Sequence, residues 1–578
     1  MKKYLFIALA ALGFAACADK LEDTKSPSHN GEVEESYIAI NLMAADVDSR
    51  ATDGNYEYGT EAEREIKNAY FFFFDENGNP FNVVGNPAAT APGGNKNYLP
   101  LNLETVANNT EGTVENVSDI SNAVLILNTY KGIYPSQIVA VLNWIPTEPT
   151  YSLDKLHELP TTLTDTVNGG YVMSNSVYMD STGKMVDAVA ITADDIKTSA
   201  AAATADPIEI YVERIAAKVV LTAEGKVADT ENIFSTQKSS DLLDVTLGGM
   251  ASTPVYVQLL GWELFNDYND SHILKSIDTT WGDSLGFSWN DYFKYRSYWA
   301  ISQNEAHNDK FYWQYSAENQ ASKGFATEYG FAVAASAEDV TTDHYTYCGE
   351  NTSEWSQSND VRTKVILKGK LLQKNGDNYE ELELASWYGN EYAGEQNLLT
   401  AVANSLSYTL FHSIDGQSFT PIKSVDIMSD TNVAGTQSYE TGFKLSAEGE
   451  GKMWYKYSSD GQHQPLGSLT DTSDMVAKTN AYLAAEVKPA IIYKNGMTYY
   501  FVDIEHLGTN DAAYGVVRNH VYQIDINSIK GYGSPIYNGL GFIVEQPEYP
   551  EVYEDSYVAA KINVLSWKVV KQSVNVGQ

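Results

Sequence analysis

The strongest catalytic pattern in the sequence is GDSLG at Gly282–Gly286, which matches the G-x-S-x-G motif of serine hydrolases. In those enzymes an apolar strand precedes the serine and a helix follows it, so that a sharp turn presents the hydroxyl. Here the polar stretch SIDTTW precedes the motif and FSWNDYF follows it, so neither context is present. We therefore interpret Ser284 as part of a polar turn and not as a nucleophile.

Metal-binding patterns give no better candidate. DENGNP at Asp75–Pro80 is similar to the start of a calcium loop, but an EF-hand needs glycine at the sixth position and Gly78 is the fourth residue. The nine histidines form no His-Glu-x-x-His motif and no His/Cys pair at zinc-ligand spacing. We predict a hairpin turn at Asp75–Pro80, no metal, no cofactor and no catalytic residue, and hence a protein that is not an enzyme.

The N-terminal segment instead carries residues on which other enzymes could act. Lys2 and Lys3 precede the apolar stretch YLFIALAALGFAA, which is too short to span a bilayer and is typical of a signal peptide. The stretch ends in GFAAC, which is similar to a bacterial lipobox and makes Cys17 the candidate lipidation site. A plain secretory signal with a chance cysteine is the alternative. Cys348 is the other cysteine, so we expect no intrachain disulfide after lipidation.

A second candidate for modification lies after a predicted strand. Residues 18–35 are polar and acidic and are typical of a tether, and Ile38, Ile40 and Leu42 then alternate as in a half-buried strand. The polar stretch DVDSRATDG follows, with Arg50 as its one basic residue. The Arg50–Ala51 bond is therefore a candidate site for an Arg-specific protease. An ordinary surface loop that contains an arginine is the alternative.

Composition limits the partners of this chain. The 578 residues are 43% hydrophobic, which is typical of globular domains, but 76 acidic against 38 basic residues give a net charge of −38. This charge repels nucleic acid and anionic lipid, so we predict no nucleic-acid partner. No segment after the signal peptide is long and apolar enough to cross a membrane as a helix.

The remaining chain is a succession of strand and turn patterns. Apolar or alternating runs are followed by turn residues, and hairpins are predicted around Asn375-Gly376 and Asn495-Gly496. Helical patterns are limited to Thr60–Asn68 and Glu395–Ser405, and residues 264–359 are interpreted as long loops. This pattern predicts an all-β fold of antiparallel β-sandwiches, with a domain boundary at Pro207 after the Ala-rich stretch KTSAAAATADP.

The C-terminal tail is apolar in an unusual pattern. An acidic, Pro-containing linker, EQPEYPEVYED, precedes it. The apolar residues of the tail lie first at even-numbered positions, then at odd-numbered ones, and then at even-numbered ones again. One flat strand therefore cannot bury all of them on one face, and bulges or two offset strands are needed. Because an unpaired apolar strand invites pairing with another chain, the tail is a candidate donor strand with the residues Ile562, Val564, Leu565, Trp567, Val569, Val570, Val574 and Val576.

Several blocks, taken in order, resemble one family. They are the lipobox ending at Cys17, Arg50 after a strand, IVAVLNW (Ile138–Trp144), YVERIAAKV (Tyr211–Val219), YCGENTSEW (Tyr347–Trp355), GVVRNHVYQIDINSI (Gly515–Ile529) and VLSWKVV (Val564–Val570). With them the chain resembles the Bacteroidetes fimbrillin family, the type V pilins, and in particular the major shaft subunits of short (minor) fimbriae. The Cys-x-Glu-Asn-Thr and Arg-Asn-His blocks are the more specific ones.

The resemblance implies two transthyretin-like β-sandwich domains and a lipoprotein precursor delivered to the outer membrane. The implied limits are a signal peptide at 1–17, a propeptide at 18–50 with the N-terminal strand, domains at 51–207 and 208–544, and a linker with the donor strand at 545–578. An Arg-specific protease would remove the propeptide, and a strand from a neighbouring copy would fill the groove left by Ile38, Ile40 and Leu42.

The implied function is that of the major subunit of a cell-surface fimbrium that supports adhesion and biofilm formation. Its expected partners are other copies of the chain in a homopolymer, accessory tip and anchor fimbrillins, and the maturation protease. One alternative is an accessory tip or anchor fimbrillin that acts as an adhesin. Another is a surface glycan-binding lipoprotein of the nutrient-uptake type, a class that is mostly helical.

Overall fold

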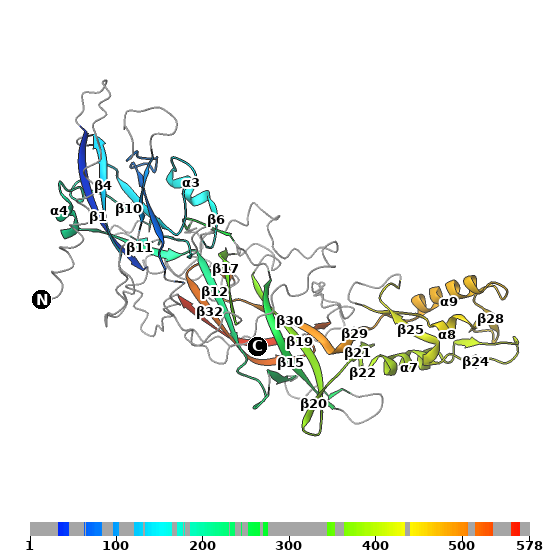
Figure 1. Cartoon of the computed structure of the whole chain (residues 1–578). Helices are drawn as coiled ribbons and strands as arrows, with labels where there is room; N and C mark the ends of the chain where they lie inside the picture. The colour runs from blue at the N-terminus through cyan, green and yellow to red at the C-terminus, as the bar shows by residue number, and fades with distance from the viewer. Residues whose placement is uncertain are drawn as a thin grey trace.

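Strands from distant parts of the sequence pair into several sheets in the computed structural model of this protein (Figure 1). The structure describes residues 33–44, 63, 65–83, 96–102, 121–130, 133–164, 170–176, 178–179, 185–230, 232–236, 244–245, 253–265, 270–275, 344–352, 363–433, 440–506, 515–535 and 557–566. Strands dominate these residues and helices are few. The predicted all-β fold class is therefore confirmed.

The N-terminal half forms an eight-stranded sheet with the order β3-β2-β5-β7-β11-β1-β4, and β10 pairs with β5. Its strands are β1 (Val33–Ala44), β2 (Asn68–Phe74), β3 (Tyr98–Asn102), β4 (Ser121–Tyr130), β5 (Gln137–Leu142), β7 (Met173–Asn175), β10 (Val189–Ala190) and β11 (Ile208–Arg214). The same half contains the helices α3 (Leu153–Glu158) and α4 (Ala200–Ala205) and the ribbon of β8 (Tyr178–Met179) with β9 (Met185–Val186).

Both faces of this sheet are buried at its centre. Phe71 and Phe73 of β2 belong to one apolar cluster, together with Ile38 and Ile40 of β1. Their neighbours Phe72 and Phe74 belong to another cluster, which also includes residues of the C-terminal half such as Ile215, Val220 and Val521. Successive strand residues point to opposite faces, so the run of four phenylalanines supplies the core of the first sheet and its contact with the second half.

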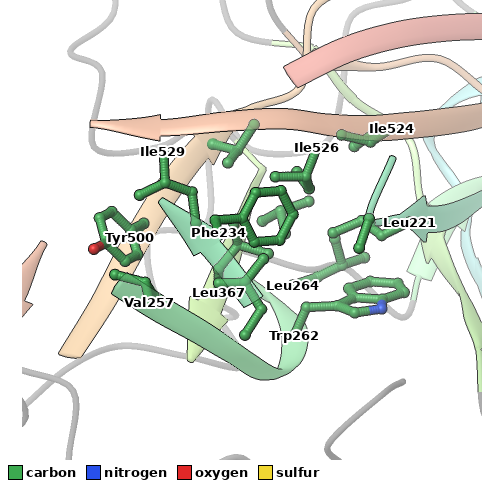
Figure 2. Packing of buried hydrophobic residues seen from close by; sticks show 14 of the residues in the cluster. Leu221, Phe234, Val257, Trp262, Leu264, Leu367, Tyr500, Ile524, Ile526 and Ile529 are labelled. Carbon is green, nitrogen blue, oxygen red and sulfur yellow. The ribbon is translucent and has the colours of Figure 1, made fainter. Parts of the chain in front are cut away.

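The C-terminal half is a β-sandwich. One sheet has the order β17-β12-β32-β34, and the other has the order β13-β15-β19-β30-β33 with β14 on β15 and β20 on β19. The strands of the sandwich are β12 (Ala216–Thr222), β13 (Ile233–Ser235), β14 (Asp244–Val245), β15 (Thr253–Phe265), β17 (Tyr345–Gly349), β19 (Lys364–Asn375), β20 (Asn378–Glu381), β30 (Met497–Asp503), β32 (His520–Lys530), β33 (Ser534–Pro535) and β34 (Tyr557–Ser566). Figure 2 shows the core between the two sheets, in which Trp262 and Leu367 of one sheet pack with Leu221 and Ile524 of the other.

Two short ribbons add to the contacts around this sandwich. β6 (Pro160–Thr162) of the N-terminal half pairs with β16 (Asp270–His272), and β18 (Asn351–Thr352) pairs with β31 (Gly515–Val516). The first ribbon joins the two halves by backbone hydrogen bonds.

A separate lobe is inserted between β20 and β30 and lies at the end of the molecule opposite β1 (Figure 1). Its own apolar core contains Leu410, Trp454 and Leu483. Its elements are β21 (Leu384–Trp387), β22 (Asn390–Ala393), α7 (Glu395–Leu406), β23 (Leu410–His412), β24 (Thr420–Pro421), η7 (Ser424–Asp426), β25 (Ile427–Asp430), β26 (Gly442–Leu445), α8 (Ala447–Glu450), β27 (Trp454–Tyr457), β28 (His463–Pro465), α9 (Thr472–Glu486), β29 (Ile491–Tyr493) and η8 (Lys494–Gly496).

Local predictions have mixed outcomes. The hairpin at Asn375-Gly376 is confirmed by the pairing of β19 with β20, and the helix at Glu395–Ser405 is α7. The hairpin at Asn495-Gly496 is wrong: both residues have the positive φ of a tight turn, but β29 pairs with β21 whereas β30 pairs with β19. The turn therefore carries the chain out of the lobe and into the sandwich.

Two other predictions need correction. The helix predicted to reach Asn68 is wrong at that end, since Asn68 begins β2. Residues 264–359 are not loops throughout, because the end of β15, β16, β17 and β18 fall there. The change of sheet also lies after the predicted boundary at Pro207: β11 still pairs with β7 and β1, and the chain enters the second sheet at β12. The other domain limits stay predictions.

Candidate functional site

The predicted N-terminal strand is an interior strand of the first sheet. β1 runs parallel to β11, with Ile40 opposite Ile208, and antiparallel to β4, with Ile38 opposite Leu125. Ile38 and Ile40 are fully buried, and Leu42 lies at the register position opposite Ile210. Because β1 has hydrogen-bonded neighbours on both sides, its removal would leave two unpaired strand edges with a gap between them. We call this position between β11 and β4 the slot.

The other face of β1 is covered by the Ala-rich helix α4. Ala39 of β1 and Ala203 of α4 are both buried. The chain before the helix adds a two-hydrogen-bond bridge between Tyr37 and Lys197, with N–O distances of 2.8 and 2.9 Å. A strand in the slot therefore needs large apolar residues at the positions of Ile38 and Ile40, and a small residue at the position of Ala39 between them.

The candidate modification sites lie outside the described residues. β1 ends at Ala44, a few positions before Arg50 and Ala51, and Cys17 precedes the described chain. The lipidation and the cleavage therefore stay predictions.

Glu63, on the C-terminal side of Arg50, is fixed to both halves of the protein. Its fully buried carboxylate accepts a hydrogen bond from Nζ of Lys218 at 2.9 Å and another from the hydroxyl of Tyr347. Nε of Arg214 donates to the Glu63 carbonyl oxygen at 2.7 Å. These residues come from β12, β17 and β11. We call the four residues the Glu63 clamp, and its contacts would hold the chain from Glu63 onward after a cut at Arg50.

The Glu63 clamp should contribute strongly to stability. Lys218→Met leaves a buried carboxylate without its cation, so we expect the free energy of unfolding to fall by about 3 kcal/mol. Urea unfolding followed by tryptophan fluorescence measures this loss. The matched control is Lys370→Met, which breaks an ion pair with Glu381 at 2.9 Å whose side chains are 29% and 46% exposed; its expected loss is below about 1 kcal/mol. Equal losses in the two variants would contradict the clamp.

The two specific sequence blocks meet in a second buried ion pair. Nε of Arg518, from the Arg-Asn-His block, donates to Oε2 of Glu350, from the Cys-x-Glu-Asn-Thr block, at 2.6 Å, and both side chains are buried. Arg518 also donates to the carbonyl oxygens of Ile273 and His272 at 3.1 and 2.8 Å. The Arg518–Glu350 pair thus holds together segments that are far apart in the sequence.

Other buried ionisable groups link the neighbourhood of the Arg518–Glu350 pair to β11, which borders the slot. Glu213 of β11 lies 3.8 Å from Nζ of Lys275, and burial raises the pKa of the Glu213 carboxyl and lowers the pKa of the Lys275 ammonium. Burial also lowers the pKa of His520 to about 4. Oδ1 of Asn519 accepts from the backbone N–H of Arg214 at 3.3 Å. The end of β11 is therefore fixed to the segment that leads into β32.

The tail is an edge strand of its own subunit as far as Ser566. β34 pairs antiparallel with β32, with Ile562 opposite Ile524, Val564 opposite Tyr522 and Leu565 opposite Val521. A register shift near Ile526–Ser528 lies in this pair. The predicted donor residues Trp567, Val569, Val570, Val574 and Val576 lie outside the described residues. Through Ser566 the tail therefore folds back on its own subunit.

Metal-binding and membrane-spanning patterns give no further site in the described part of the chain. Groups of three or more His, Cys, Asp or Glu that could hold a metal are absent among these residues. The helices that the structure describes are all too short or too polar to cross a membrane. Asp75–Pro80 is the predicted turn, in which Oδ1 of Asp75 accepts from the N–H groups of Asn77 and Asn79 at 2.8 and 2.9 Å. Ser284 lies outside the described residues.

A family model matches the C-terminal part of the chain. Residues 491–573, which include η8, β30–β34 and Arg518, match the family model described as major fimbrial subunit protein type IV, fimbrillin, C-terminal. No curated protein matches the chain. The match confirms the resemblance to fimbrillins, which are structural proteins and not enzymes.

The chain is also similar to solved structures of fimbrial proteins. A fimbrilin from Porphyromonas gingivalis W83 is 13% identical, with 93% of this chain and 99% of that chain covered at a TM-score of 0.34. The tip fimbrial protein Mfa3 from Porphyromonas gingivalis is 12% identical, with 91% and 99% covered at a TM-score of 0.26. A fimbrial assembly protein from Parabacteroides distasonis is 10% identical, with 75% and 100% covered at a TM-score of 0.27.

Proposed function

We propose that this chain is the major shaft subunit of a cell-surface fimbrium and polymerises by donor-strand exchange. The precursor would be tethered to the outer membrane through a lipid on Cys17, and an Arg-specific protease would cut after Arg50. The observation that supports this most strongly is the place of β1: an interior strand that lies on the N-terminal side of the candidate cleavage site. Once β1 is released, the tail of another copy would fill the slot.

The residue requirements of the slot point to a specific register for the incoming tail. Aligning residues 563–569 with residues 36–42 places Leu565 at the position of Ile38, Trp567 at that of Ile40 and Val569 at that of Leu42. Ser566, also a small residue, then takes the position of Ala39, which is buried on the face of β1 that α4 covers. A register with Val574 and Val576 at the positions of Ile38 and Ile40 brings Asn575 to the position of Ala39 and Gln578 to that of Leu42.

This register also accounts for the changing parity of the tail. In its own subunit, Ile562 and Val564 take the positions opposite Ile524 and Tyr522, which are core residues of the sandwich. Leu565, Trp567 and Val569 have the other parity and would serve the slot of a neighbour. Exchange would then require the end of β34 to leave β32. The released segment would lose its pairing at a sheet edge and gain a position in the slot with a neighbouring strand on each side.

Electron microscopy after cleavage tests both the function and the register. Negative-stain images of the protein treated with an Arg-specific protease should show filaments. Ser566→Trp should abolish them, because the larger side chain would collide with α4, while Asn575→Trp should leave them intact. Thermal melting of the uncut variants checks that each subunit still folds.

Each contrary outcome has a different meaning. Complete cleavage after Arg50 without filaments would overturn the shaft-subunit proposal. Filaments that form with Ser566→Trp but not with Asn575→Trp would keep the donor-strand mechanism and replace the register by the one that uses Val574 and Val576.

A further inference from the structure

The lobe inserted between β20 and β30 carries most of the exposed large hydrophobic side chains in the described part of the chain. Eight of the eleven exposed large hydrophobic side chains belong to the lobe: Tyr388, Tyr408, Ile414, Val425, Met428, Met453, Tyr457 and Leu469. Single exposed apolar residues are ordinary, whereas a gathering of them often marks an interaction site. One sheet of the lobe shows where such a site lies.

The sheet with the order β24-β23-β27-β28 has one core face and one aromatic face. Leu410 of β23 and Trp454 of β27 belong to the core of the lobe. On the other face, Phe411 lies opposite Tyr455, and Tyr457 lies opposite His463. Phe419, two positions before Pro421, shares this face because Pro421 pairs with Phe411. We call Phe411, Phe419, Tyr455, Tyr457 and His463 the aromatic platform.

The rings of the aromatic platform are in mutual contact. Phe419 and His463 are stacked in parallel with centroids 3.8 Å apart, and His463 lies 4.8 Å from Phe411 and 4.9 Å from Tyr457. Tyr455 packs edge-on beneath Phe419 at 5.2 Å, while Tyr457 is 45% exposed. The outer face of an antiparallel sheet is ordinarily polar. A continuous aromatic outer face therefore indicates a binding surface.

The surroundings of the platform are polar and carry two aspartates, one in each turn of the sheet. The two turns of this sheet share the pattern Ser-x-Asp-Gly-Gln, at 413–417 and 458–462. Asp415 accepts from the N–H groups of Gln417 and Ser418 at 2.8 and 2.7 Å, and these bonds lower the pKa of its carboxyl. Asp460 likewise accepts from Ser458 and Gln462. Both carboxylates accept hydrogen bonds within their own turns and keep their negative charge, which disfavours an anionic ligand beside the platform.

Neutral hydrogen-bonding groups remain around the platform. Gln417 and Gln462, in the two turns, are exposed, and their side chains make no hydrogen bond with the described part of the chain. Nε2 of His463 also has no hydrogen-bond partner among the described residues. Aromatic ring faces beside a few amide groups suit a neutral ligand that has one apolar side and hydroxyl groups at its edge.

We infer that the aromatic platform is a binding site for neutral carbohydrate. The apolar C–H face of a pyranose ring would stack on Tyr457 and its neighbours, and the hydroxyl groups would bond to the glutamine amides. The platform lies at the end of the molecule opposite β1 (Figure 1), so sugar binding and strand exchange use different surfaces. The inference does not depend on the proposed assembly mechanism.

Affinity electrophoresis of the uncut protein tests this inference. Native gels are cast with mannan, galactomannan, xyloglucan or dextran as neutral probes and with hyaluronan as the anionic one. We expect retardation in at least one neutral gel and none with hyaluronan. Tyr457→Ala and Phe411→Ala should each weaken the apparent affinity at least tenfold, whereas Tyr388→Ala, an exposed tyrosine of the same lobe outside the platform, should leave it unchanged.

Several results would overturn the inference. Unchanged mobility in all four neutral gels, retardation by hyaluronan alone, or equal losses in Tyr388→Ala and Tyr457→Ala would each do so. Sedimentation of the protease-treated protein provides a further arm: if Tyr457→Ala changes its association while mobility in the gels stays the same, the platform is a contact between copies of the chain and not a sugar site. Thermal melting of each variant confirms that the lobe stays folded.

Discussion

Arg50→Ala should give a folded subunit that is never incorporated into a filament. Without the cut, β1 keeps its place between β11 and β4, and Ile38 and Ile40 keep the slot filled. A neighbouring tail would then have to displace a strand with hydrogen bonds on both sides that is covalently attached to its own subunit. Negative-stain microscopy should show the loss of filaments, and intact-mass spectrometry should show the retained propeptide, with lipid on Cys17.

The matched control is Arg64→Ala, at the next arginine along the chain. This variant should still be cut after Arg50 and should assemble like the unaltered protein. Filaments built from uncut Arg50→Ala protein would show that the propeptide does not block assembly, and that the tail reaches its partner without the slot being emptied.

Ending the chain after Ser566 should abolish assembly and leave the subunit intact. This truncation keeps β34, which pairs with β32, and removes Trp567, Val569 and the residues that follow. In the proposed register, two of the three large residues for the slot are then missing. The truncated protein should be cut after Arg50, melt close to the full-length protein, and remain monomeric in sedimentation.

A longer truncation separates the two roles of the tail. Ending the chain after Ser556 also removes β34 and exposes the edge of β32, so the melting temperature should fall clearly as well. If the chain that ends at Ser566 melts as early as the one that ends at Ser556, residues after Ser566 are part of the subunit core. If the chain that ends at Ser566 still forms filaments, the donor-strand proposal is wrong.

Short-range patterns in the sequence were sufficient to predict much of the fold. The apolar alternation of Ile38 and Ile40 and the Asn375-Gly376 turn depend on neighbouring residues, and the structure has strands and a hairpin there. The helix α9 was missed although its signals are present: Asp471 caps its N-terminus, and Met475, Thr479 and Leu483 bury one face at helical spacing.

Long-range relations could not be predicted from such patterns. The partners of β1 are β11 and β4, which lie far along the chain, and no local signal specifies them. The Glu350–Arg518 pair shows the same limit, since the sequence marks both blocks but does not indicate that they meet. The change of sheet at Ile215 could not be predicted either, because Ile215 alone separates β11 from β12 and no glycine or proline marks the change.

The direct connection of β11 to β12 has a mechanical consequence for a filament of the proposed kind. A tail held in the slot would pull along β11, whose backbone continues through Arg214 and Ile215 into β12, and β12 pairs in parallel with β32. Hydrogen bonds between strands lie across the strand direction, so tension along the filament loads all bonds of a pair together in shear instead of opening them one at a time. The covalent bridge from β11 to β12 would thus transmit tension from one joint to the next without placing it on the side-chain contacts between the two halves.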